Sequence, residues 1–102
     1  MEKTQAQTLL EKLNAGVKDS VIVNVAGVDF KFNRDNAAYD TMINEIDSGN
    51  KVTPIKDYLL AIIEPAQKDD FLQVINVAGL AIQVAGAVNK VLVPKIEVTV
   101  KN

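Results

Sequence analysis

The sequence predicts an α+β fold in which a small antiparallel sheet packs against four to five helices. Two patterns support this prediction. Apolar residues alternate with other residues between Val21 and Phe32, as in a β-hairpin, and again in the C-terminal residues 95–101. Elsewhere, apolar residues recur three and four positions apart, which is the spacing of an amphipathic helix. The sheet is therefore expected to consist of an N-terminal β-hairpin plus a C-terminal strand.

The first half of the chain supplies a helix, the hairpin and a second helix. The first helix is expected to end near Gly16, and the hairpin is expected to turn at Ala26 and Gly27. Each element has one apolar face that can be buried. The residues of these three faces are Ala6, Leu9, Leu10 and Leu13; Val21, Val23, Val25, Val28, Phe30 and Phe32; and Tyr39, Met42, Ile43 and Ile46.

The second half supplies a helix at residues 53–63, a further helical stretch after Pro65, and a long apolar helix that ends before Pro94. An irregularity in the long helix is expected near Gly79. Residues 95–101 then alternate, and their apolar members are expected to point inward: Ile96, Val98 and Val100. A single strand needs a partner, and the N-terminal hairpin is the obvious one.

Residues 1–102 are expected to form one domain, because the chain has no linker, internal repeat or low-complexity tract. Residues 1–16 form an N-terminal helical extension in this interpretation, and residues 21–102 form the core.

The composition limits the classes of function. The chain has no cysteine and no histidine, which removes thiolate metal sites, disulfides and the commonest general base. A net charge of −2 gives no electrostatic footprint for nucleic acid. The N-terminus lacks the basic and apolar regions of a secretion signal, so a cytoplasmic protein is expected.

No catalytic residue, metal site or cofactor site is predicted. Asp69 and Asp70 are adjacent and face different directions, so they do not form a paired-carboxylate site. The glycines Gly79 and Gly86 lack the spacing of a phosphate-binding loop. We therefore expect no enzyme.

Residues 71–89 carry no charge, which meets the length criterion for a membrane-spanning helix. However, Asn76, Gln83 and Lys90 lie seven residues apart and form a polar stripe on one side. A helix exposed to lipid has no reason to keep such a stripe, because an unpaired amide is unfavourable in hydrocarbon. We therefore do not expect this stretch to cross a membrane.

The same stretch carries two apolar faces. The first, opposite the polar stripe, is the natural core face: Val74, Ala78, Ala81, Ala85, Val88 and Leu92. The second has heptad spacing and is a candidate partner-binding seam: Val77, Leu80, Val84, Ala87 and Val91. Two explanations remain open for the seam. Neighbouring helices of the same chain could bury it, or it could be left for a partner helix or another copy of the chain.

Three segments, in this order and spacing, resemble the tail assembly chaperones of long-tailed bacteriophages: "GNKVTPIKDYLLAII", "VAGLAIQVAGAVNKVL" and "PKIEVTVKN". The upstream "VDFKFNRDNAAYDTMINEI" also resembles the strand and helix of that family. The resemblance covers about residues 21–102 and is weakest in the first sixteen residues. None of these segments is a catalytic signature.

The resemblance implies a chaperone that binds the tape measure protein, keeps it soluble, and helps recruit tail tube subunits during tail assembly. It also implies work in the cytoplasm of the bacterial host. Self-association is expected separately, because an uncovered seam would form an apolar patch. The net charge and the polar stripe predict no nucleic-acid or membrane partner. Two alternatives are a structural phage tail or head-completion subunit retained in the virion, and a small regulatory interaction protein.

Overall fold

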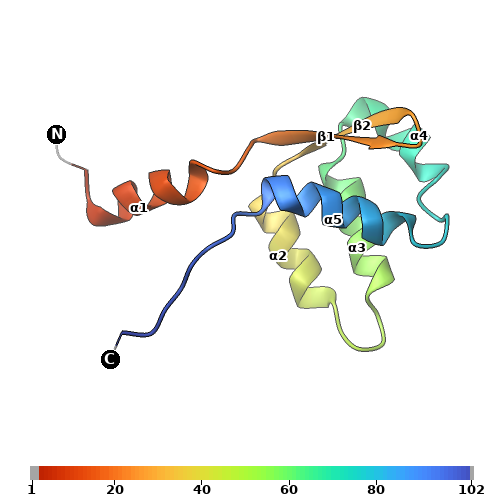
Figure 1. Cartoon of the computed structure of the whole chain (residues 1–102). Helices are drawn as coiled ribbons and strands as arrows, with labels where there is room; N and C mark the ends of the chain where they lie inside the picture. Colours follow the sequence, from red (N-terminus) through yellow and green to blue (C-terminus); the bar gives the residue numbers. More distant parts are fainter. Residues whose placement is uncertain (1–2, 102) are drawn as a thin grey trace.

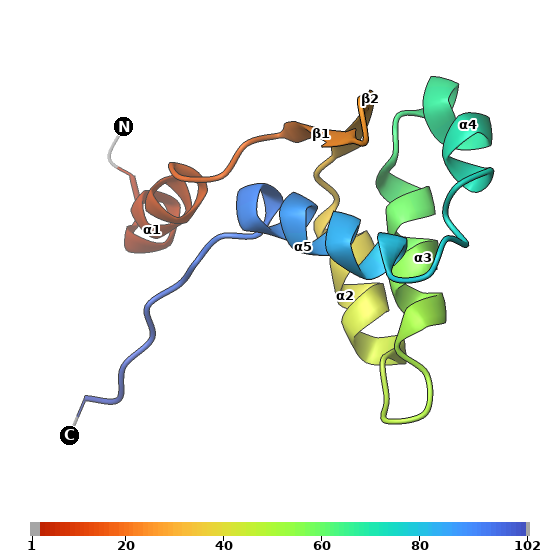
Figure 2. The ribbon, with the colours of Figure 1, turned by 45° about the vertical axis from the view of Figure 1, so that its right-hand side comes forward.

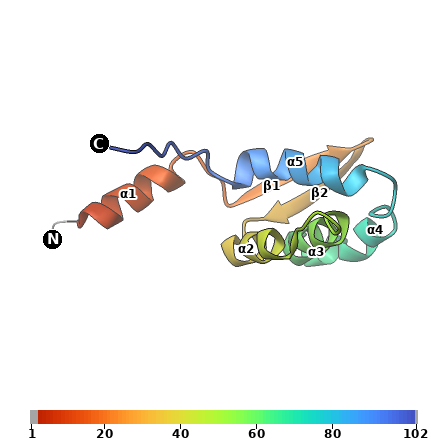
Figure 3. The same cartoon turned by 90° about the horizontal axis from the view of Figure 1, so that it is seen from below.

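The computed structural model describes residues 3–101 and confirms the α+β class (Figure 1). The elements follow one another as α1 (Gln5–Asn14), β1 (Ser20–Val25), β2 (Val28–Asn33), α2 (Asn36–Glu45), α3 (Val52–Ile62), the 3₁₀ turn η1 (Pro65–Gln67), α4 (Lys68–Leu72) and α5 (Leu80–Leu92). The hairpin and α5 lie on one side of the molecule, and α2, α3 and α4 lie on the other (Figure 3).

The predicted hairpin is confirmed. β1 and β2 pair in antiparallel orientation, with Val21 opposite Phe32 and Val23 opposite Phe30. The turn residues Ala26 and Gly27 both have positive φ angles, 50° and 96°. This is the backbone that a two-residue turn needs to match the twist of its strands.

The core forms where the hairpin meets the helices. Phe71 of α4 is fully buried and packs edge-to-face against two rings of β2. Its ring centroid lies 5.1 Å from that of Phe30 and 5.5 Å from that of Phe32. Such edge-to-face contacts add to the stabilisation that burial itself gives. Phe71 therefore fastens the short helix α4 to the sheet.

The outer edge of β2 is closed by the chain that follows α3. The N–H of Glu64 donates a 2.8 Å hydrogen bond to the carbonyl oxygen of Lys31. The Gln67 side chain accepts from the N–H of Lys31 at 2.7 Å and donates to the carbonyl oxygen of Asp29 at 2.9 Å. The Gln67 amide thus takes the place of a neighbouring strand.

The predicted C-terminal strand is wrong. Residues 93–101 form no strand and extend away from the body of the molecule (Figure 1). Val98 and Val100 are 83% and 85% exposed. Val93 ends α5 with an extended backbone (φ −109°, ψ 121°), and a residue that precedes proline favours this conformation. The chain therefore leaves α5 without the reversal that pairing with its own hairpin would need.

The predicted long apolar helix is divided. α4 ends at Leu72, turns occupy residues 73–79, and α5 begins at Leu80. Gly79 has a φ of 79°, a left-handed conformation that interrupts a right-handed helix. The irregularity expected near Gly79 is therefore a full break.

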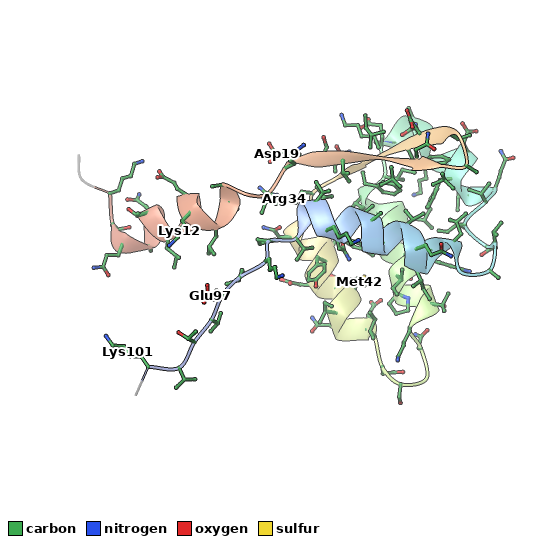
Figure 4. All side chains as sticks on the ribbon, in the orientation of Figure 1. Lys12, Asp19, Arg34, Met42, Glu97 and Lys101 are labelled. Atoms are coloured by element: carbon green, nitrogen blue, oxygen red, sulfur yellow. The ribbon has the colours of Figure 1, made fainter. Side chains whose placement is uncertain are left out.

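The helix α1 projects from the body on the same side as the C-terminal segment (Figure 2). None of its described residues is buried. Arg34, which follows β2, lies beside Asp19 (Figure 4). Its guanidinium donates hydrogen bonds of 3.4 Å to Oδ1 of Asn14 and to Oδ1 of Asp19. Both partners lie on the surface, so these contacts hold α1 only weakly.

Candidate partner-binding site

The helix α5 is the centre of the candidate site because it contacts both β1 and α3. Within α5, the predicted core face is buried at Ala81, Ala85, Val88 and Leu92. The other two predicted core residues precede the helix: Ala78 is exposed and Val74 is half-buried. Because of the break at Gly79, only the members of the predicted core face that lie within α5 (Leu80–Leu92) are fully buried.

The five predicted seam residues do not share one environment. Val84 is buried at 5% exposure and belongs to the core. Leu80 and Val91 are half-buried. Val77 is 59% exposed and lies before α5, in the turns, while Ala87 is exposed on the helix. The seam is therefore covered at its centre and open on both sides.

Four of the seam residues line a groove between α5 and β1. The groove has a volume of about 420 Å³, and its far wall is formed by residues 23–26 of the hairpin. Its floor on the α5 side is apolar, from Val77, Leu80, Val84 and Ala87. Val91 lies outside it. The structure thus brings most of the predicted site together, against a strand.

The predicted polar stripe is dispersed. Gln83 lines the groove, and a Cβ atom on Gly79 would lie 3.2 Å from its Nε2 atom. Asn76 lies in the turns and accepts a 2.8 Å hydrogen bond from Nζ of Lys56 on α3. Lys90 borders a separate hollow of about 890 Å³ between α1 and the C-terminal segment. Only Gln83 is therefore placed to border the groove.

The side of α5 opposite the groove is anchored to α3. The Tyr58 hydroxyl donates a 2.9 Å hydrogen bond to Oδ1 of Asn89. Burial of the phenol, together with the nearby Tyr39 and Asp35, raises the pKa of Tyr58 to about 12. Tyr58 is thus a neutral structural donor at physiological pH.

Residues 3–101 contain no group of three or more acidic, histidine or cysteine side chains that could hold a metal ion. None of the helices within this part of the chain is long and apolar enough to cross a membrane.

Sequence reasoning did not predict which edges of the hairpin are covered. Hydrophobic alternation predicts which side chains of a strand are buried, but it does not say which edge is covered. The edge of β2 is closed partly by the Gln67 side chain, a contact between residues 36 positions apart. No local pattern predicts such a contact.

These features define a small α+β protein that offers an apolar groove, which is typical of proteins that act by binding. A model of the family described as phage tail assembly chaperone matches residues 21–102. The chain therefore belongs to the phage tail assembly chaperone family.

A relative from Haemophilus phage HP1 (strain HP1c1) is described as an uncharacterized 11.3 kDa protein in the lys 3′ region. It is 66% identical over 102 residues, which is the full length of both chains. No solved structure matches this chain.

Proposed function

We propose that this protein binds the tape measure protein, keeps it soluble, and helps recruit tail tube subunits during tail assembly. It would do so in the cytoplasm of the bacterial host, by binding rather than by catalysis. Membership of the tail assembly chaperone family supports an assembly role. The choice of these two partners and of this compartment is the proposal.

The groove between α5 and β1 is the observation that carries the proposal. An amphipathic helix binds such a groove by laying its apolar side chains against the groove walls. Val77, Leu80 and Ala87 are the seam residues of the groove that keep exposed surface, so they are the proposed contacts. Val84 would support them from below, because its own side chain is already buried.

The test is co-expression with the tape measure protein encoded by the same phage, followed by affinity purification and light scattering. We expect a soluble complex of fixed stoichiometry with a tape measure protein that precipitates when expressed alone. A tape measure protein that stays insoluble in the presence of this chain would contradict the proposal.

Two variants locate the contact. Val77→Glu places a charge at the groove, and Ile82→Glu places the same charge on the side of α5 that faces away from it. The two side chains are comparably exposed, at 59% and 51%, so both variants should fold. We expect Val77→Glu to abolish the complex and Ile82→Glu to preserve it. The reverse result would place the contact elsewhere on α5.

A further inference from the structure

The edge of β1 that faces away from β2 carries unpaired backbone groups. Lys31 directs its N–H and carbonyl away from β1, toward Gln67 and Glu64. Ile22 lies opposite Lys31, so Ile22 also directs its N–H and carbonyl outward, and Asn24 does so by alternation. Within residues 3–101, no other backbone group hydrogen-bonds to these outward groups. β1 is therefore an open sheet edge, a surface that native proteins usually cover.

The C-terminal residues 95–101 also have unpaired backbone groups and the sequence pattern of a strand. They alternate as a strand does, yet within the described part of the chain their backbone groups make no hydrogen bond to other backbone groups. Their apolar members are all exposed: Ile96 at 52%, Val98 at 83% and Val100 at 85%. Glu97 and Lys101 likewise point into solvent along a segment that stands clear of the body (Figure 4).

We propose that residues 95–101 of one copy pair as a strand with the open edge of β1 in a second copy of this chain. The added strand would hydrogen-bond to the outward groups of Ile22 and Asn24. Its inward face of Ile96, Val98 and Val100 would lie over the groove beside β1. The sheet would then have three strands, the third contributed by the other copy.

The dimensions of the two segments agree. β1 has six residues, and the segment from Lys95 to Lys101 provides seven. At about 3.3 Å per residue, both extend for roughly 20 Å. The groove runs beside residues 23–26 of the hairpin, so a strand on this edge has apolar surface beneath it from Leu80 and Ala87.

The backbone at the end of α5 favours a second copy over the same copy. Val93 is extended and is followed by Pro94, which disfavours the helical conformation at Val93. Pro94 is itself half-buried and lies with Val93 in a hollow beside Tyr39. The segment is thus fixed in a direction that leads away from its own β1. Exchange of this strand between two copies would cover both the open edge of β1 and the exposed apolar side chains of residues 95–101.

The first test compares two charged variants of the full chain by light scattering at several concentrations. Val98→Glu places a charge on the inward face, and Thr99→Glu places it on the outward face of the same strand. We expect wild type and Thr99→Glu to have at least twice the mass of one chain, and Val98→Glu to have the mass of one chain. A wild-type monomer at every concentration tested, or equal behaviour of the two variants, would overturn the proposal.

The second test distinguishes the two copies. The chain has no cysteine, so single cysteines can be introduced cleanly. Ile22→Cys and Thr99→Cys are prepared as separate proteins with different tags, mixed, and treated with a short bismaleimide. We expect a cross-linked pair that carries both tags. A third protein carries both Ile22→Cys and Thr99→Cys in one chain. If the separate proteins do not cross-link and this double variant cross-links within one chain at high dilution, the segment covers its own β1 and the proposal is wrong.

The proposal does not depend on binding of the tape measure protein, since both tests use this chain alone. If both proposals hold, the exchanged strand and a tape measure helix overlap at the groove. Addition of tape measure protein would then lower the yield of the two-tag cross-link.

Discussion

The Tyr58 hydroxyl donates a hydrogen bond of 2.9 Å to Oδ1 of Asn89 and so joins α3 to α5, the helix that carries the candidate groove. Tyr58 is 4% exposed, whereas Asn89 is half-buried. If the hydrogen bond is lost, the two polar groups therefore differ in their access to water. Water can reach the amide of Asn89, but it cannot readily reach the hydroxyl of Tyr58.

Removing either partner should thus have unequal effects. We expect Tyr58→Phe to lower the free energy of unfolding by about 1 kcal/mol, the usual contribution of one hydrogen bond. Asn89→Ala leaves a buried donor without an acceptor, and we expect a loss of about 2 kcal/mol. Urea unfolding of both variants measures the difference. A larger loss in Tyr58→Phe than in Asn89→Ala would contradict this assignment.

The raised pKa of Tyr58 predicts a loss of stability in alkali. The folded protein holds the phenolic proton up to a pKa of about 12, whereas an unperturbed tyrosine ionises at 10.0. Above pH 10 the unfolded chain therefore releases a proton that the folded chain keeps. The contribution is fully present below pH 10 and is lost as the pH rises toward 12.

The loss amounts to an energy on the order of 2 kcal/mol for a shift of this size. Urea unfolding between pH 8 and 12 measures it, and the Tyr58→Phe protein is the control for effects of alkali that do not involve Tyr58. We expect the wild-type stability to fall more steeply than that of the variant. Parallel pH profiles would show that Tyr58 is not the group responsible.

Removal of residues 1–16 tests whether residues 21–102 fold without α1. The described part of α1 buries no side chain, and its end is held to the body through the surface contacts of Arg34. Contacts of this kind contribute about 0–1 kcal/mol. We expect the shortened chain to unfold cooperatively, with a free energy of unfolding within about 1 kcal/mol of wild type. Loss of the cooperative transition would show instead that α1 is part of the core.

The sequence predicts those features that depend on neighbouring residues. The hairpin follows from the period-two pattern and from a turn that ends in glycine. A glycine within an apolar helix predicts an irregularity near Gly79, but not the full break that separates α4 from α5. The C-terminal strand was mispredicted because alternation shows that a segment can pair, but not with which edge. Val93 and Pro94 decide the direction of that segment, and their effect depends on where α5 ends.

The candidate site was predicted only in part, because residue spacing does not show which side chains are buried or which distant segment lies beside them. Heptad spacing identifies Val77, Leu80, Val84 and Ala87, which the structure places around one groove. It does not distinguish the buried Val84 from the exposed Val77, because the spacing assumes a helix that continues through Gly79. The second wall of the groove comes from β1, more than fifty residues earlier in the chain.

The two glycines of this region should respond in opposite directions to the same substitution. Gly79 has a φ of 79°, a conformation that disfavours a side chain by about 1–2 kcal/mol, so we expect Gly79→Ala to destabilise the protein. Gly86 lies within α5 with no neighbouring atom within 4 Å of an added Cβ, so Gly86→Ala should stabilise it by about 0.5–1 kcal/mol. Thermal unfolding compares both with wild type. Stabilisation by Gly79→Ala would show that the chain can form a continuous helix through residue 79. Val77, part of the groove floor, would then have to move.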